Sequence, residues 1–175
     1  YTKMLIGSVP SMKPPKRNKV SGNPALIIKQ INKTFGGLGF FGNGRKVHAA
    51  KSVSFDIRAG ETTGIVGESG SGKSTVARCV IRLIDPNSGK ILINNIDVAK
   101  LKESKLRPLR NNFQIVFQDP YRSLNPRRTV GQSIIEGPTN FGIPIAEATQ
   151  RAKDLMKIVG LQTDSLERFP HQFSG

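Results

Sequence analysis

Residues 67–75 of this chain read Gly67-Glu68-Ser69-Gly70-Ser71-Gly72-Lys73-Ser74-Thr75. They match every fixed position of the pattern G-x-x-x-x-G-K-[ST], which binds the phosphates of a nucleoside triphosphate. The glycines leave room for backbone N–H groups to surround the β- and γ-phosphate oxygens. Lys73 supplies a mobile positive charge to the same oxygens, and the Ser74 hydroxyl is placed to coordinate Mg²⁺. These residues therefore predict a site for a nucleoside triphosphate and a magnesium ion.

The residues on both sides of this loop predict the elements that such a site needs. Before the loop, Thr63–Val66 is a short, mostly apolar run that is typical of a buried strand. After the loop, apolar residues at helical spacing predict a helix with one apolar face, made of Val76, Ala77, Val80, Ile81 and Ile84. Asp85–Gly89 is expected to end that helix. Strand, glycine loop and helix in this order predict an α/β fold of the P-loop NTPase kind.

The composition narrows the class of protein. With 175 residues, of which 37% are hydrophobic, the chain is long enough for one domain with a core. It has no run of 18 apolar residues that could span a membrane, and Met4-Leu5-Ile6 is too short for the core of a signal peptide. Its one cysteine, Cys79, is expected to be a small core residue in a reducing compartment. These features favour a soluble, cytoplasmic domain.

The formal net charge of +15 permits more than one interpretation. A strongly basic chain can bind nucleic acid or an anionic membrane surface. Part of the charge lies in residues 1–24, a stretch with five basic residues, no acid and several prolines, which is typical of a solvated linker. Aromatic residues make up only 6% of the chain and do not alternate with basic ones, so we expect no direct nucleic-acid binding. Solvated faces are favoured, and contact with a membrane or a partner is the alternative.

The pattern of apolar residues predicts several strands around the glycine loop. The first begins at Ala25 and contains Leu26-Ile27-Ile28 and Ile31, and the second covers Ala50–Ile57. Gly89–Val98 is predicted to be a hairpin with Asn94-Asn95 at its turn, and Phe113–Phe117 is predicted to be a further strand. Gly37-x-Gly39-x-x-Gly42 formally matches a dinucleotide-binding pattern, but we interpret it as a loop because no helix can follow it directly.

The C-terminal part of the chain has a helical pattern. Val130–Glu136 is predicted to be a short helix, and Ile145–Val159 a longer one that ends at Gly160. The apolar residues of the longer helix are expected to share one buried face, formed by Ala148, Ala152, Leu155, Met156 and Val159.

The order of motifs resembles that of the ATP-binding cassette family. Phe117-Gln118-Asp119-Pro120 looks like the glutamine loop of that family, and Phe173-Ser174-Gly175 looks like the start of its signature motif. The runs Asp119–Arg127 and Arg168–Gly175 are similar to the ATPase subunits of bacterial dipeptide, oligopeptide and glutathione importers. The resemblance covers residues 25–175. It implies a P-loop NTPase fold with an antiparallel β subdomain and, from about residue 119, the start of a helical subdomain, with the chain ending before the Walker B strand.

The N-terminal residues carry a resemblance of their own. Residues 1–10 look like the C-terminal end of a cassette from the same importer group. This implies that residues 1–24 are the tail of a preceding cassette with a basic, proline-rich linker, and that the intact protein is a tandem of two cassettes. The alternative is an ordinary N-terminal extension.

The resemblance also implies roles for particular residues. Phe35 matches the aromatic residue that stacks on adenine, although a role in core packing is an equal alternative. Gly67–Thr75 would hold the triphosphate of ATP, and Ser74 and Gln118 would coordinate Mg²⁺. Ser174 and Gly175 would contact the ATP that is bound to the opposite cassette. Gln118 would sense the γ-phosphate and signal to the membrane-spanning subunits.

The resemblance implies the function of an importer ATPase. ATP binding and hydrolysis would drive the uptake of peptides or similar small solutes, with the protein held at the cytoplasmic face of the bacterial inner membrane. Its partners would be the membrane-spanning subunits, a second cassette and, indirectly, a solute-binding protein. The catalytic glutamate and switch histidine of the family follow the signature motif, so we assign no catalytic residue within residues 1–175. We therefore expect the isolated chain to lack ATPase activity and the full-length parent to hydrolyse ATP.

Three other functions fit parts of the sequence. One is a soluble ABC-type ATPase that acts on nucleic acid or ribosomes, which the positive charge would suit. Another is a nucleotide-binding remnant that does not hydrolyse ATP. An unrelated P-loop kinase would explain the glycine loop but not the glutamine loop and signature start.

Overall fold

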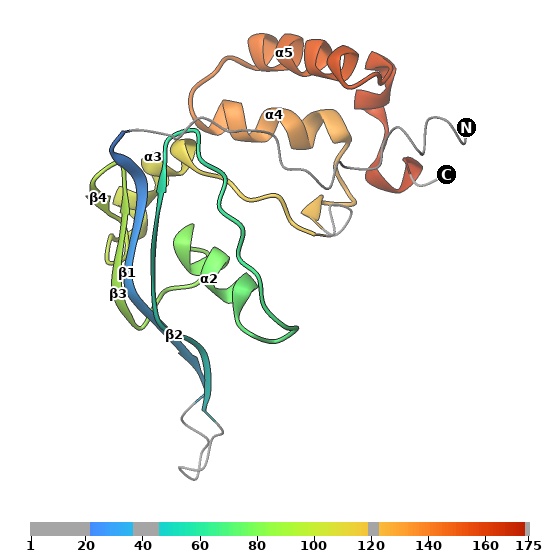
Figure 1. Cartoon of the computed structure of the whole chain (residues 1–175). Coiled ribbons are helices and arrows are strands. Elements are labelled where there is room, and N and C mark those ends of the chain that lie inside the picture. Colours follow the sequence, from blue (N-terminus) through green and yellow to red (C-terminus); the bar gives the residue numbers. More distant parts are fainter. Residues whose placement is uncertain (1–21, 37–45, 119–122, 174–175) are drawn as a thin grey trace, which may run out of the picture. The chain divides into compact units, whose positions relative to one another are not determined.

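The computed structural model describes residues 22–36, 46–118 and 123–173. The chain divides into two compact units, Tyr1–Lys100 and Leu101–Gly175 (Figure 1). The first unit contains a β-sheet and the helix that follows the glycine loop, and the second is mainly helical. Each unit is described separately below.

The sheet of the first unit has four strands, β1 (Pro24–Phe35), β2 (Val47–Arg58), β3 (Ser88–Ile93) and β4 (Ile96–Asp97). Their order is β2-β1-β3-β4, and each neighbouring pair is antiparallel. The two predicted strands that flank the glycine-rich stretch are confirmed, and so is the hairpin. Its turn residues Asn94 and Asn95 both have positive φ, 48° and 66°. Asparagine tolerates this conformation, which a two-residue hairpin turn requires. Gly37–Gly42 lies outside the described residues, between β1 and β2.

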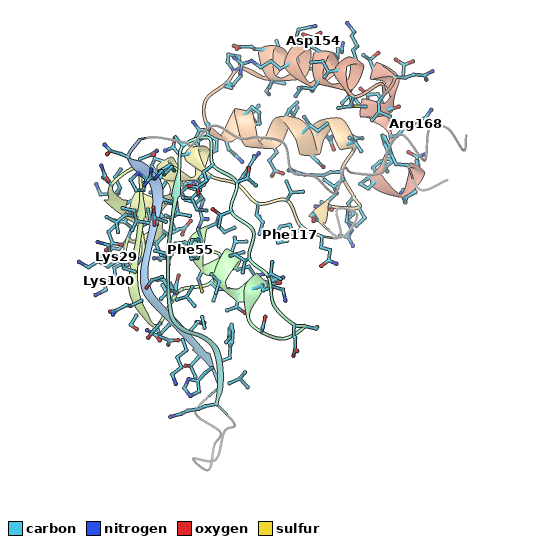
Figure 2. All side chains as sticks on the ribbon, viewed as in Figure 1. Lys29, Phe55, Lys100, Phe117, Asp154 and Arg168 are labelled. Carbon is cyan, nitrogen blue, oxygen red and sulfur yellow. The ribbon has the colours of Figure 1, made fainter. Side chains whose placement is uncertain are left out.

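One side of the sheet forms the core of the first unit. Ile28 on β1 pairs with Phe55 on β2 and with Ile91 on β3, and Ile28 and Ile91 are fully buried. Phe55 lies on the side of the sheet that faces helix α2, and Lys29 lies on the opposite side (Figure 2). Ile31 is also buried, although residues three apart on a regular strand point to opposite faces. A register shift between Ile28 and Ile31, with Gln30 at a φ of 51°, brings both side chains into the core.

Helix α2 (Lys73–Val80) begins inside the glycine loop and packs against β1 and β2 (Figure 1). It ends at Val80, so the prediction that Asp85–Gly89 ends it placed the end too late. Arg82 has a φ of 55°, and its N–H bonds to the carbonyl of Cys79, while the Leu83 N–H bonds to that of Arg78. These two bonds form a Schellman motif, which closes a helix through a left-handed residue. The prediction that Cys79 is a core residue is confirmed, because its side chain is fully buried.

Two predicted strands are absent from the described residues. Neither Thr63–Val66 nor Phe113–Phe117 is a strand, and Val66 and Val116 are 96% and 87% exposed. An apolar run indicates which side chains favour a buried strand, but a strand also requires a neighbour that pairs with its backbone groups. No described strand pairs with either segment, so both sequence predictions are wrong for this structure.

The second unit begins with α3 (Glu103–Leu109), followed by the 3₁₀ turn η1 (Arg110–Asn112). It continues with α4 (Val130–Asn140), α5 (Ile145–Ile158) and the 3₁₀ turns η3 (Thr163–Glu167) and η4 (Pro170–Gln172). The two predicted helices are confirmed, with α4 longer than expected. Helix α3 was not predicted, because it is short, has only two large apolar residues and contains Pro108. No helix among the described residues has the length and apolar character needed to cross a membrane.

Helices α4 and α5 and the turn η3 share a small apolar core. Ala152, Met156 and Leu166 are buried in it, and Ile134 and Ile135 of α4 pack against them. The predicted apolar face of α5 is therefore correct for its i, i+4 series, which also includes Ala148. It is wrong for Leu155 and Val159, which are 55% and 65% exposed. Leu155 lies beside that series, and Val159 is the residue that follows the last helical one. Gly160 has a φ of 74°, which confirms its predicted role after the helix.

We expect Thr129→Ala to lower the free energy of unfolding by about 1 kcal/mol. The Thr129 hydroxyl accepts the N–H of Gln132 at 3.2 Å, and the Gln132 side chain accepts the N–H of Thr129 at 3.1 Å, so the substitution breaks the capping box of α4. Denaturant unfolding would measure the loss. Thr129→Ser keeps the hydroxyl and should stay close to the original protein; an equal loss in both variants would contradict the capping role.

We expect Cys79 to resist alkylation by iodoacetamide at pH 8.5 until the protein unfolds. Burial raises the pKa of the Cys79 thiol, so the folded state keeps the thiol protonated and shielded. The stabilising effect of this shift is complete below the unfolded pKa and is lost as the pH rises through the folded pKa. Mass spectrometry with and without denaturant would measure the labelling, and rapid labelling of the folded protein would contradict the burial.

Candidate functional site

The glycine loop reaches helix α2 through two residues in the left-handed conformation. Gly70 and Gly72 have φ values of 81° and 92°, which side chains rarely permit. Between them, the Ser71 N–H donates to the Glu68 carbonyl at 3.2 Å and closes a turn. Gly72 is the N-cap of α2, so the positive end of the helix dipole opens directly onto the loop. This arrangement suits an anion, because the N–H groups of the first turn of a helix have no partner within the helix and the helix dipole points the same way.

Gly72 also fixes the loop to the sheet. A Cβ atom at this position would overlap the carbonyl oxygen of Ala49 on β2. The backbone of the loop can therefore reach β2 only because residue 72 has no side chain. At Gly70 a Cβ atom would meet nothing within 4 Å. Both glycines are thus required by their backbone conformation, and Gly72 is also required by its close packing against β2.

The Lys73 ammonium lies within the loop. It donates hydrogen bonds to the carbonyl oxygens of Gly67 at 2.8 Å and Glu68 at 2.6 Å, and it lies 3.4 Å from the Ser71 hydroxyl. The loop residues 67–71 and Ser74 are exposed, so an anion can reach the ammonium from solvent. A lysine head group on a flexible stem can turn towards phosphate oxygens without moving the backbone. The predicted role of Lys73, to bring its charge to phosphate oxygens, stays a prediction.

Phe35 is at the end of β1, in the same unit as the loop. Its side chain is 40% exposed, so the alternative that it packs in the core is wrong. The Lys33 ammonium lies 5.1 Å from the centre of its ring. An exposed aromatic ring offers a surface on which a nucleobase can stack.

The other predicted site residues lie outside this unit. Gln118 belongs to the second unit and is exposed. Ser174 and Gly175, together with Asp119–Arg122 of the glutamine-loop run, lie outside the described residues. Two hollows of the second unit, of about 500 and 660 Å³, contain none of the predicted site residues. The glycine loop, the start of α2 and the end of β1 thus all belong to the first unit.

Sequence reasoning missed three contributors to this site. The Ala49 carbonyl contacts Gly72, the Lys33 ammonium lies over the Phe35 ring, and the Arg82 N–H bonds to the Cys79 carbonyl at the end of α2. Lys33 could have been found, because residues two apart on a strand share a face and Phe35 was already named. Nothing in the sequence pattern signals Ala49 or Arg82, since Ala49 acts through the contact of its carbonyl with the distant Gly72 and Arg82 through a left-handed backbone conformation. The described residues contain no group of three or more His, Cys, Asp or Glu side chains that could hold a metal ion.

A glycine loop that opens a helix beside a sheet, with its lysine in the loop, defines a P-loop nucleotide-binding protein. The antiparallel strands before the loop and the helical unit after it narrow this class to proteins that combine an antiparallel sheet, a glycine loop and a helical unit. The chain belongs to the ABC transporter family, whose pattern its residues 50–175 match. This establishes the family that the motif order suggested.

Two curated relatives illustrate the likeness. The chain is 43% identical over 160 residues to the "Glutathione import ATP-binding protein GsiA" of Salmonella paratyphi A, covering 89% of this chain and 26% of that protein. It is 48% identical over 130 residues to the "Probable peptide ABC transporter ATP-binding protein y4tS" of Sinorhizobium fredii, covering 74% of this chain and 37% of that one. The chain thus spans between a quarter and two fifths of the lengths of these relatives.

Solved structures confirm the cassette fold. The chain is similar to the dimeric structure of MJ0796, a bacterial ABC transporter cassette, with a TM-score of 0.72 and 28% identity over 86% of this chain and 63% of that chain. A second structure of MJ0796, a dimer in a post-hydrolysis state bound to ADP and Pi, gives a TM-score of 0.71 at 27% identity, over 85% of this chain and 63% of that one.

Because the two glycines differ, Gly72→Ala and Gly70→Ala form a matched pair. Both place an alanine in the left-handed region, which costs about 1–2 kcal/mol. Gly72→Ala also pushes a methyl group into the Ala49 carbonyl, and we expect it to lose a further 1–3 kcal/mol or so. Denaturant unfolding of the nucleotide-free protein would compare them, and equal losses would show that the contact with β2 is unimportant.

Proposed function

We propose that this chain binds ATP and Mg²⁺ and forms part of the ATPase subunit of a bacterial importer for peptides, glutathione or similar small solutes. The observation that carries the proposal is the Lys73 ammonium held inside a glycine loop at the start of α2. A cation on a flexible stem, turned backbone N–H groups and a helix dipole all favour the phosphates of a nucleotide. Membership of the ABC transporter family supports ATP as that nucleotide.

We assign the residues of the ATP site as follows. Gly67–Thr75 surround the triphosphate, with Lys73 paired to its terminal phosphates. The Phe35 ring stacks on adenine, an assignment that its exposed position at the end of β1 supports. Ser174 and Gly175 contact the nucleotide of an opposing cassette.

Ser74 and Gln118 are assigned to the magnesium ion. The Ser74 hydroxyl is exposed in the first turn of α2, directly after Lys73, and the Gln118 side chain is exposed in its own unit. Neutral oxygen ligands of this kind suit Mg²⁺, which binds mainly through phosphate oxygens and water in nucleotide sites. The ion would neutralise charge on the phosphates. No acidic cluster is needed for that role.

We propose the following role and location for the intact protein. ATP binding and hydrolysis drive import through membrane-spanning subunits, with the protein peripheral at the cytoplasmic face of the inner membrane. The names of the two curated relatives, which concern glutathione import and peptide transport, support the solute class. A solute-binding protein takes part indirectly. Gln118 links the nucleotide to the membrane-spanning subunits.

The domain organisation is also a proposal. Residues 1–24 are the tail of a preceding cassette and a linker, and residues 25–175 form the N-terminal part of a nucleotide-binding domain with its helical subdomain from about residue 119. The exposed apolar side chains of Val66 and Val116 support a further part of the domain that covers them. Paired strands beside Thr63–Val66 and Phe113–Phe117 would satisfy both segments.

We expect Lys73→Ala to weaken ATP binding by the intact protein about 10- to 100-fold, because it removes charge-assisted hydrogen bonds to the phosphates. Steady-state ATP hydrolysis should fall to background. Calorimetric titration and phosphate release would measure the two effects. Uptake of a labelled dipeptide or of glutathione into vesicles that hold the membrane-spanning subunits should be lost in parallel.

Lys29→Ala is the matched control. It removes the same charge from β1, on the side of the sheet away from α2 (Figure 2). ATP binding, hydrolysis and uptake should stay unchanged in this variant. Unchanged ATP turnover in Lys73→Ala would overturn the assignment of the loop. If the original protein hydrolyses ATP but drives uptake of neither solute, the ATPase assignment stands and the proposed role in import is overturned.

A further inference from the structure

We infer that Lys33 is a positioning residue of the nucleotide site. Its ammonium holds the Phe35 ring in place for the base and ties that ring to the segment that follows the phosphate-loop helix. The inference rests on the proposed function, because it takes Phe35 as the residue that stacks on adenine. It adds a residue outside the glycine loop that controls how strongly the base, rather than the phosphates, contributes to binding.

The contacts of Lys33 define this role. Its ammonium nitrogen lies 5.1 Å from the centre of the Phe35 ring, within the range of a cation–π interaction. The same nitrogen donates a hydrogen bond to the backbone carbonyl of Asp85 at 2.7 Å. One face of the ring is therefore occupied by a cation that is itself held in place, while 40% of the Phe35 side chain remains exposed. The exposed part of the ring is then available for a base to stack on.

The carbonyl that holds Lys33 belongs to a well-anchored segment. The Asp85 carboxylate pairs with Arg82 at 3.1 Å, and the Arg82 guanidinium also donates to the carbonyls of Val98 and Ala99. Two residues further on, the Asn87 N–H donates to the Asn32 carbonyl at 2.8 Å, and its side chain accepts the N–H of Thr34 at 2.7 Å. Asn87 thus bonds to β1 on both sides of Lys33. These bonds hold the segment after α2 in place, and with it the Asp85 carbonyl that accepts from the Lys33 ammonium.

Lys33 also lies next to the point where the glycine loop meets the sheet. Its register partner on β2 is Ala50, and the neighbouring Ala49 is the residue whose carbonyl receives Gly72. Lys33, which holds the ring, and Gly72 of the phosphate loop therefore lie against two consecutive residues of β2, Ala50 and Ala49. A bound nucleotide needs both ends placed together, since a displaced ring loses the base contact even when the phosphates remain bound.

A purely structural role for Lys33 makes a different prediction. If Lys33 only joins β1 to the segment after α2, its loss should disturb the whole unit and weaken every ligand of the loop equally. If it positions Phe35, its loss should weaken only ligands that have a base. Inorganic tripolyphosphate shares the phosphates of ATP and lacks the base, so the ratio of the two affinities separates the roles.

The test is calorimetric titration of the intact protein with Mg-ATP and with magnesium tripolyphosphate. We expect Lys33→Met to weaken ATP binding about two- to fivefold, the range of an exposed cation–π contact, and to leave tripolyphosphate affinity unchanged. Lys33→Arg keeps a cation above the ring and should retain most of the ATP affinity. Lys29→Met, on the same strand and on the side of the sheet away from α2 (Figure 2), is the matched control and should change neither ligand.

A second comparison makes the result specific to Phe35. Phe35→Leu should also lower ATP affinity alone, and adding Lys33→Met to it should cause no further loss. Equal weakening of ATP and tripolyphosphate in Lys33→Met, or an unchanged ATP affinity, would overturn the role of Lys33. If Phe35→Leu changes neither ligand, the stacking assignment itself fails, and the inference fails with it. If the original protein binds neither ATP nor tripolyphosphate, the assignment of the glycine loop as a phosphate site fails, and the proposed function fails with it.

Discussion

The close approach of Gly72 to the Ala49 carbonyl is the contact on which the site depends. It places the first turn of α2 against β2, and it leaves no room for a side chain at the N-cap. Because α2 begins at that point, Lys73 enters the loop and reaches the carbonyls of Gly67 and Glu68. The conformation of the loop, the direction of the helix dipole and the place of the lysine thus follow from one contact between two backbones.

The sequence predicted most of the elements that surround this contact, because their signals are local. A run of apolar residues identified β1, alternating apolar residues identified β2 and the β3–β4 hairpin, and the i, i+4 spacing identified α5. The glycine loop could be assigned from its own sequence, since the residues of the phosphate-binding pattern are contiguous. The buried pair Ile28 and Ile31 shows the limit of such signals. Only the bulge at Gln30, which no pattern announces, puts both on one face.

What could not be predicted depends on partners that are distant in sequence. Val66 carries the apolar side chain of a buried strand, yet it is exposed here because no described strand pairs with its segment. Arg82 adopts a left-handed conformation that the sequence does not suggest, and its guanidinium bonds to carbonyls that follow β4. Helix α3 has too few apolar residues to show a period. In each case the deciding energy comes from a tertiary contact rather than from a local preference.

The two halves of a nucleotide site therefore place different demands on a chain. Phosphate binding needs one loop, one helix end and one close backbone contact, all of which the first unit supplies from residues near in sequence or in register. Base binding needs an aromatic ring that remains exposed, and exposure leaves a ring without packing to hold it. In the proposed site the Lys33 ammonium over the Phe35 ring meets both needs, because it holds the ring while 40% of the side chain stays exposed. An ammonium suits that position better than an apolar side chain would, since its hydrogen bond to Asp85 holds it without enclosing the ring.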